Sequence, residues 1–173
     1  MGRRVSILNT LSALATAQSR LGTPLGEVLL ARTARGLAGA WFAGQKDHPG
    51  VLGAAELPAD PLLQLAARQI TDYFDRQRRH FELPLDLHGT PFQVAVWHAL
   101  LRIEAGQTQS YADIARAISS ANAVRAVGSA VGKNPVSIIV PCHRVIGSDG
   151  TLTGYAGGLD RKRALLCLEG ALR

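Results

Sequence analysis

The chain has 173 residues and a formal net charge of +6, and 47% of its residues are hydrophobic. Such a chain can form one domain, or a small domain beside a mid-sized one, around a buried core. No apolar run approaches the roughly 18 residues of a membrane span, and two cysteines are too few for a disulfide framework. Arg3 and Arg4 precede a stretch that polar residues interrupt, so we expect no signal peptide and reduced thiols in the cytoplasm.

The first half predicts a small lobe of strands and one helix. Thr23-Pro24-Leu25-Gly26 indicates a turn, and residues 27–33 and 37–42 are typical of an antiparallel hairpin. Residues 43–59 are rich in Gly and Pro and predict a loop. Asp60-Pro61 combines an N-cap with a proline at the first helical position and predicts a helix to about Arg78. Residues 81–88 predict an extended linker between two lobes.

The second half predicts short helices. Thr90-Pro91-Phe92-Gln93 carries a capping box and predicts a buried helix to about residue 103, with His98 in the core or at its boundary. Ser110 with Asp113 predicts a cap for a helix over 111–118, and Asn122 one for a helix over 123–131. Two short helices around a tight turn are typical of a helix-turn-helix. The basic excess is compatible with DNA but is equally common elsewhere.

The last third centres on Cys142. Residues 138–140 predict a short β run that leads to it, and residues 148–150 a turn. Asp160 predicts the cap of a helix over 161–169, with Cys167 in the core and Gly170 ending the helix. The predicted fold class is α/β (α+β): an amino-terminal lobe over 1–87 with a β-hairpin and helix, and a mostly helical domain with a helix-turn-helix over 88–173.

Cys142 and His143 stand side by side between two apolar runs. A thiolate is the attacking form of cysteine, and a neighbouring proton acceptor or positive charge raises the thiolate fraction. The alternative is a buried cysteine that acts as a small hydrophobe, and the pair alone leaves both interpretations open. No Cys and His spacing is typical of a zinc site, so we expect no metal.

Motifs in order along residues 88–171 extend this observation. They are Gly89-Thr90-Pro91-Phe92-Gln93, Ser110-Tyr111, Arg125-Ala126-Val127-Gly128, Asn134-Pro135-Val136, Pro141-Cys142-His143-Arg144-Val145, Tyr155-Ala156-Gly157-Gly158 and Glu169-Gly170. With these motifs the chain resembles the O6-alkylguanine-DNA alkyltransferases. The resemblance is weaker over residues 1–87, and the cysteines of the amino-terminal zinc site that some members carry are missing.

The resemblance implies direct-reversal DNA repair. The alkyl group of O6-alkylguanine moves irreversibly and stoichiometrically to the protein's own cysteine, and no cofactor takes part. The range of alkyl groups and activity on O4-alkylthymine stay open. By matching position, catalytic roles fall to Cys142, His143, Glu169 and Asn134, substrate contacts to Tyr111, Val131, Val145, Tyr155 and Ala156, and DNA contacts to Arg125, Ala126 and Gly128.

Each implied role is specific. Cys142 accepts the alkyl group, His143 takes its proton through a water, Glu169 orients His143, and Asn134 holds the turn. The Tyr111 hydroxyl donates to the guanine ring, and the main-chain N–H of Ala156 donates to O6. The carbonyls of Cys142 and Val145 accept hydrogen bonds from the exocyclic amine of the guanine, while Tyr155 and Val131 line the pocket. Lys162 matches a family lysine near the pocket, and a solvated helix residue is an equal alternative.

The implied partner is double-stranded DNA, bound through the minor groove with a flipped nucleotide whose place Arg125 takes. On pattern alone, residues 123–131 are more typical of an Ala-rich helix that packs in the core. The resemblance instead implies that this helix binds DNA. The resemblance implies a monomer when free and no membrane contact, and it leaves cooperative binding on DNA open.

Three alternatives compete with this interpretation. A thiol hydrolase with a Cys-His-Glu triad would turn over without DNA. Lesion binders that resemble this family but transfer no alkyl group have Trp in place of the nucleophile. The presence of Cys142 argues against this alternative. A transcription factor would need more base-reading side chains than the second helix offers.

Overall fold

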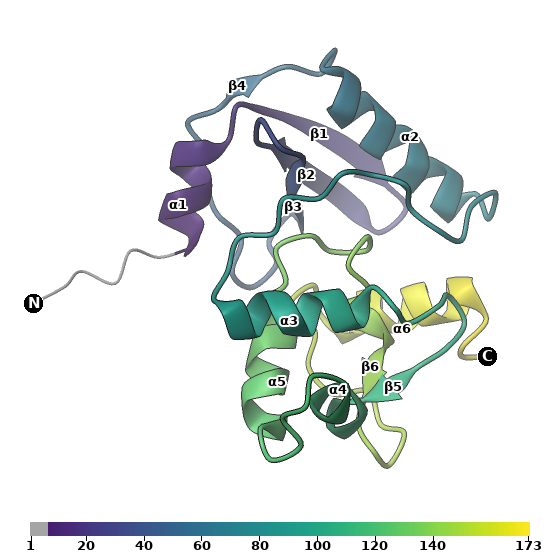
Figure 1. Ribbon diagram of the computed structural model, residues 1–173. Coiled ribbons are helices and arrows are strands. Elements are labelled where there is room, and N and C mark those ends of the chain that lie inside the picture. The colour runs from purple at the N-terminus through teal and green to yellow at the C-terminus, as the bar shows by residue number, and fades with distance from the viewer. Residues whose placement is uncertain (1–6) are drawn as a thin grey trace, which may run out of the picture.

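The computed structural model describes residues 7–173, so Arg3 and Arg4 lie outside the described residues. The strands of the first half form one sheet in the order β3-β2-β1-β4, with only β1 and β4 parallel. Helix α2 packs along this sheet, and α1 lies near its end (Figure 1). The bounds are α1 Ile7–Leu14, β1 Ala17–Thr23, β2 Gly26–Arg32, β3 Leu37–Phe42, β4 Ala55–Glu56 and α2 Pro61–Phe74.

Strand β2 is buried on both faces of the sheet. Its side chains alternate, so Val28 and Leu30 join the main core, whereas Leu29 and Ala31 join a smaller cluster around Trp41. The predicted hairpin is confirmed as β2 and β3, and the predicted turn joins β1 to β2. The remaining strands, β1 and β4, are not predicted by the sequence pattern.

Strand β1 is hidden in the sequence by polar residues that the fold nevertheless buries. Gln18 is 7% exposed, and its amide donates to the carbonyls of Leu52 (3.2 Å) and Ala54 (2.6 Å). A buried amide is tolerated when its hydrogen bonds are made. These bonds tie the loop before β4 to the sheet.

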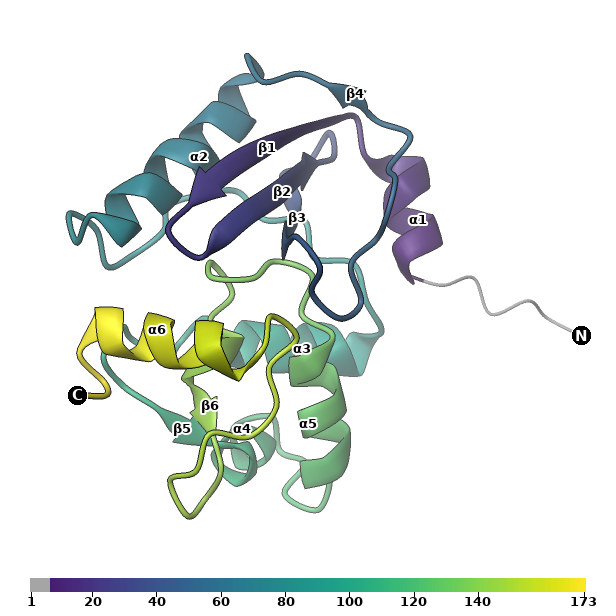
Figure 2. The ribbon, with the colours of Figure 1, turned by 180° about the vertical axis from the view of Figure 1, so that it is seen from behind.

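The second half packs short helices beneath the sheet (Figure 2). The capping boxes of Thr90 with Gln93 and of Ser110 with Asp113 are confirmed, and the indole Nε1 of Trp97 donates to the carbonyl of Ala130 at 2.8 Å. The bounds are α3 Pro91–Leu100, β5 Gln109–Ser110, α4 Tyr111–Ala117, α5 Val124–Gly132, the 3-10 helix η1 Cys142–Arg144, β6 Val145–Ile146 and α6 Leu159–Glu169.

Two predicted caps are wrong. Asn122 does not cap α5, which begins at Val124 after Ala123 and has no side-chain cap bond. Asp160 lies inside the first turn of α6, because the chain turns into this helix two residues earlier, at Gly158 with φ 91°. A positive φ of this kind favours glycine.

Other predicted positions also differ. Helix α2 ends at Phe74, four residues early, and Arg76 has a left-handed φ of 59°. Residues 138–140 form a turn instead of a β run, with Ile138 at φ 72°. His98 and Cys167 are exposed, not buried.

The two halves share contacts along the predicted linker and the sheet edge. The N–H of Leu37 donates to the carbonyl of Pro84 (2.8 Å), so residues 81–88 run beside β3. Ala40 of β3 exchanges main-chain hydrogen bonds with Pro135 and Ser137 at 2.9 Å each. One buried cluster contains side chains from both halves. None of the helices in residues 7–173 has the length and apolar character that a membrane crossing requires.

Candidate active site

Cys142 begins the 3-10 helix η1 directly after Pro141. Cys142 is only 5% exposed, but it lines the wall of a cavity of about 320 Å³. This volume lies within the range of about 300–1,000 Å³ that is usual for small-molecule sites. The cavity is lined by Lys46, Asp47, Tyr111, Gly128, Ser129, Val131, Gly132, Lys133, Cys142, Gly154, Tyr155 and Ala156.

Asn134 holds the turn that presents this thiol. Its Oδ1 accepts from the N–H of Val136 at 2.9 Å, and its Nδ2 donates to the carbonyl of Val140 at 2.7 Å. Asn134 is 4% exposed, so these bonds replace water. They also explain why residues 138–140 turn instead of extending as a strand: the side chain draws the carbonyl just before Pro141 back toward residue 134.

His143 and Glu169 form a buried pair behind the cavity. The Nε2 of His143 lies 2.8 Å from Oε1 of Glu169. Arg144 donates two hydrogen bonds to the same carboxylate, from Nε to Oε2 (3.0 Å) and from Nη2 to Oε1 (2.8 Å). It also donates to the carbonyl of Ile103. The Tyr73 hydroxyl adds a fourth donor, to Oε1 at 2.7 Å. The carboxylate is therefore fully hydrogen-bonded and fixed.

The protonation states follow from burial and these partners. Burial opposes ionisation of Glu169, but the hydrogen bonds from His143 and Arg144 outweigh it and hold the pKa of this carboxyl below its ordinary value. Burial lowers the pKa of His143, against the pull of Glu169. A carboxylate only accepts, so Nε2 of the neutral imidazole carries the proton and Nδ1 keeps its lone pair. Nδ1 is buried and has no hydrogen-bond partner within the described part of the chain.

The resting thiol differs from the sequence-based expectation. Burial raises the pKa of Cys142, although a hydrogen bond from Asn134 and the charge of Lys162 act in the opposite direction. The thiol is therefore neutral until a base removes its proton, instead of standing as a thiolate. An adjacent imidazole with a free lone pair is such a base.

Lys162 is buried, so its interpretation as a solvated helix residue is wrong. Its Nζ donates to the carbonyls of Val145 (2.5 Å), Thr153 (2.8 Å) and Gly154 (3.3 Å). Burial lowers its pKa to about 8, and the Cys142 sulfur opposes that shift. Lys162 thus fixes the loop over 153–154 to Val145 at the start of β6 and places a positive charge near the thiol.

The cavity brings together most of the predicted substrate contacts. Tyr111, Tyr155, Ala156 and Val131 line the wall, and the Tyr111 hydroxyl donates to the carbonyl of Thr153 at 3.2 Å. Gly157 has no side chain to displace the Tyr155 ring, since a Cβ there would lie 2.7 Å from it. Val145 is the exception: it does not line the cavity, and its carbonyl accepts from Lys162.

Helix α5 carries the predicted DNA contacts. Arg125 and Ala126 are exposed on it, outside the cavity lining, whereas Gly128 lines the cavity itself. The predicted DNA contacts therefore divide between the exposed surface of α5 and the cavity wall.

Sequence reasoning missed the groups that arrive from distant parts of the chain. Arg144 and Tyr73 hold Glu169, and Lys46 and Asp47 contribute to the cavity wall. Arg144 lay within a motif that the sequence displays, but nothing local indicates its partner. Among the described residues, no three His, Cys, Asp or Glu side chains are grouped so that they could hold a metal ion.

Comparisons with known proteins agree with this geometry. Two family models match the chain: the ribonuclease-like domain of 6-O-methylguanine DNA methyltransferase over residues 19–87 and its DNA binding domain over 91–171. The methylated-DNA–protein-cysteine methyltransferase of Methanosarcina barkeri is 46% identical over 152 residues, which are 85% of this chain and 92% of that protein. The chain belongs to the 6-O-methylguanine DNA methyltransferase family.

Other members of the 6-O-methylguanine DNA methyltransferase family are similar in sequence and in fold. The inducible methylated-DNA–protein-cysteine methyltransferase of Bacillus subtilis is 51% identical over 125 residues, which are 72% of this chain and 68% of that protein. The crystal structure of Mycobacterium tuberculosis OGT in complex with DNA matches with a TM-score of 0.82 and 43% identity, covering 90% of this chain and 94% of that one. The predicted α+β fold class is confirmed by this match.

Proposed function

We propose that this chain is a methylated-DNA–protein-cysteine methyltransferase that repairs O6-alkylguanine in DNA by direct reversal. The observation that carries this proposal is the arrangement around Cys142: a buried thiol on a cavity wall, followed by a histidine whose Nε2 is engaged by Glu169. The names of the relatives support the same activity. Cys142, His143, Glu169 and Asn134 are its catalytic group.

The proposed step balances without a cofactor. The Cys142 sulfur attacks the alkyl carbon, the S–C bond forms, and the bond from that carbon to O6 breaks. The thiol proton passes to His143 Nδ1 through one water. The departing guanine gains a proton on its ring from the Tyr111 hydroxyl, and the proton that His143 carries restores this hydroxyl through solvent, so the thiol proton ends on the guanine. Glu169 stabilises the imidazolium that forms in between. Because the product is a thioether, which water does not cleave at a useful rate, each molecule acts once.

The cavity residues would hold the guanine. The Tyr111 hydroxyl exchanges its hydrogen bond to Thr153 for one to the guanine ring, and the N–H of Ala156 donates to O6. Tyr155 and Val131 pack against the base. The carbonyl of Cys142 would accept a hydrogen bond from the exocyclic amine, and so would that of Val145, which lies outside the cavity lining. The Val145 carbonyl already accepts from Lys162, but a carbonyl oxygen has two lone pairs and can serve both.

Duplex DNA is the partner in this proposal. A target base inside the stack must be flipped out to reach a buried thiol, which costs a few kcal/mol and less for a damaged pair. The helix-turn-helix of α4 and α5 places Arg125, Ala126 and Gly128 in the minor groove, and Arg125 fills the vacated space. Contacts to phosphate would make binding salt-sensitive and indifferent to sequence.

The organisation of the chain completes the proposal. Residues 1–87 and 88–173 are two domains, the protein is monomeric when free, and it works in the cytoplasm, where thiols stay reduced. The boundary near residue 87 is supported by the two separate family matches.

The decisive experiment is alkyl transfer followed by mass spectrometry. The protein is incubated with a duplex that contains O6-methylguanine, and intact and peptide masses are measured. We expect one methyl group, on the peptide that holds Cys142, and no turnover. Cys142→Ser should bind the duplex and gain no mass, and Cys167→Ser is the matched control, since that thiol is exposed and outside the cavity. Repeated turnover would favour a hydrolase, and binding by the wild type without mass gain would favour a lesion binder.

Arg125→Ala is expected to weaken repair of duplex DNA about tenfold or more while single-stranded substrate is repaired nearly as before. A side chain that fills the space of a flipped nucleotide matters only when there is a stack to open. Transfer rates on both substrates measure this. Arg68→Ala, an exposed arginine on α2, controls for the loss of one positive charge. Equal losses on both substrates would contradict the role of Arg125.

A further inference from the structure

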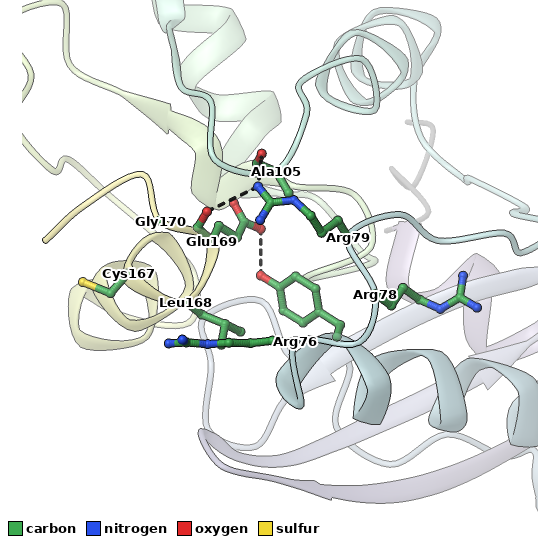
Figure 3. A pocket seen from close by; sticks show the side chains of 9 residues that line it. Arg76, Arg78, Arg79, Ala105, Cys167, Leu168, Glu169 and Gly170 are labelled. Atoms are coloured by element: carbon green, nitrogen blue, oxygen red, sulfur yellow. Dashed lines mark hydrogen bonds between the residues drawn. The ribbon is translucent and has the colours of Figure 1, made fainter.

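A second cavity, of about 260 Å³, lies beside Glu169 and does not include Cys142. It is formed where the end of α2 meets the end of α6 (Figure 3). In Figure 3, Arg76 and Arg78 point away from the Glu169 carboxylate, and Arg79 reaches main-chain oxygens, those of Ala105 (2.7 Å) and Glu169 (3.4 Å). These arginines therefore do not hold the carboxylate.

The group that reaches the carboxylate from this side is the hydroxyl of Tyr73, at 2.7 Å from Oε1. Tyr73 is 3% exposed, and burial raises the pKa of its hydroxyl above the ordinary value, with the negative charge of Glu169 adding to the effect. The phenol is therefore protonated and is the donor. It comes from α2, 96 residues away in the chain, so the amino-terminal half supplies part of the buried network.

The bond matters because of which oxygen it uses. Oε1 of Glu169 accepts from Tyr73, from Nη2 of Arg144 and from Nε2 of His143, whereas Oε2 accepts from Nε of Arg144. Tyr73 and His143 thus donate hydrogen bonds to the same oxygen of the Glu169 carboxylate. A carboxylate oxygen that already satisfies a phenol presents less negative charge to the imidazole.

We propose that Tyr73 is a positioning residue for the alkyl transfer: its hydroxyl fixes Oε1 of Glu169 and limits how strongly that oxygen favours protonated His143. This rests on the proposed function. His143 then remains neutral, with Nδ1 ready to accept the thiol proton. The charged and titratable groups that face His143 are Glu169 and Lys162 from α6 and Cys142 and Arg144 from η1.

Tyr73→Phe tests this inference with two readouts. Imidazole NMR gives the titration of His143, whose signal is identified by its loss in His143→Asn. The rate of methyl transfer as a function of pH gives the acid limb where His143 becomes protonated. Removing the hydroxyl leaves more negative charge on Oε1 of Glu169. The midpoint of the His143 titration and the midpoint of the acid limb should therefore both move to higher pH by about half a unit. Transfer on the acid limb should accordingly slow about threefold, with a smaller change above it.

Phe81→Leu is the matched control. The Phe81 ring packs against Tyr73 with ring centroids 5.5 Å apart, so this variant loosens the same cluster and keeps the hydroxyl. It should lower stability without moving either midpoint. Coincident midpoints for Tyr73→Phe and wild type, or an equal shift in Phe81→Leu, would overturn the proposal. The NMR titration needs no DNA, so a failure of the wild type to gain a methyl group would count against the proposed function alone.

Discussion

Glu169→Gln is expected to lower the free energy of unfolding by about 3–5 kcal/mol, the usual effect of removing one partner from a buried ion pair. The substitution leaves the Arg144 guanidinium buried, at 7% side-chain exposure, without its counter-charge. It also removes the negative charge that stabilises protonated His143. The methyl-transfer rate should therefore fall by about 100-fold even in the folded fraction.

The same carboxylate predicts how stability depends on pH. The pKa of Glu169 lies below its ordinary value of 4.5 because of His143 and Arg144. The unfolded chain thus binds a proton at this site before the folded one does as the pH falls. The stabilisation is fully present above pH 4.5 and is lost progressively below it. Glu169→Gln should lack this part of the acid-induced loss.

Urea unfolding at several pH values measures both effects, and single-turnover transfer measures the rate. Glu104→Gln is the matched control, because this glutamate is exposed. It should unfold and transfer like the wild type. A Glu169→Gln protein with wild-type stability and rate would show that the buried network contributes to neither.

Local signals in the sequence were reliable where the interacting residues are neighbours in the chain. Asp60, Thr90 and Ser110 each cap a helix through bonds to residues two or three positions ahead. The failed cap at Asp160 shows the limit of this rule. Gly158 sets the direction of the chain before that helix, and a residue type alone does not reveal a backbone angle.

The buried face of α6 is visible in the structure but not in the pattern of hydrophobic residues, because it carries two charged side chains. Lys162, Leu165, Leu166 and Glu169 are all buried, at the i, i+3, i+4, i+7 spacing of one helical face. A lysine and a glutamate on an apolar face are buried only if they are paired. Cys167 is out of phase with this face, which is why it is exposed instead of lying in the core. The observed burial therefore follows one helical face, and the exposed thiol lies off that face.

Contacts between distant residues could not be predicted from the sequence. The partners of Glu169 come from positions 25 to 96 residues away, and the Tyr73 bond depends on how the two halves pack. Cys142, His143 and Asn134 were found because they lie in short motifs that resemble a known family. Tyr73 lies in a short piece, Tyr73-Phe74, that belongs to the weaker resemblance of residues 1–87, but that piece indicates no partner for its hydroxyl.

Asn134→Ala is expected to cost about 3 kcal/mol of stability and to slow methyl transfer strongly. The buried N–H of Val136 loses its acceptor, and the carbonyl of Val140 loses its 2.7 Å donor. An unsatisfied buried polar group costs about 1–3 kcal/mol. Without the amide, the turn before Pro141 loosens and the thiol loses its position.

Two variants separate these contributions. Asn134→Asp keeps an acceptor for Val136 but places a carboxylate oxygen against the carbonyl of Val140 in a buried site, so it should transfer slowly and lose at least as much stability as the alanine variant. Asn122→Ala is the control of the same residue type, because Asn122 is exposed and makes no cap bond to α5, and it should change stability by less than about 0.5 kcal/mol. Urea midpoints and single-turnover rates decide between these outcomes. If Asn134→Ala and Asn122→Ala matched in both measurements, the thiol would owe its position to Pro141 and the surrounding core instead of to the asparagine.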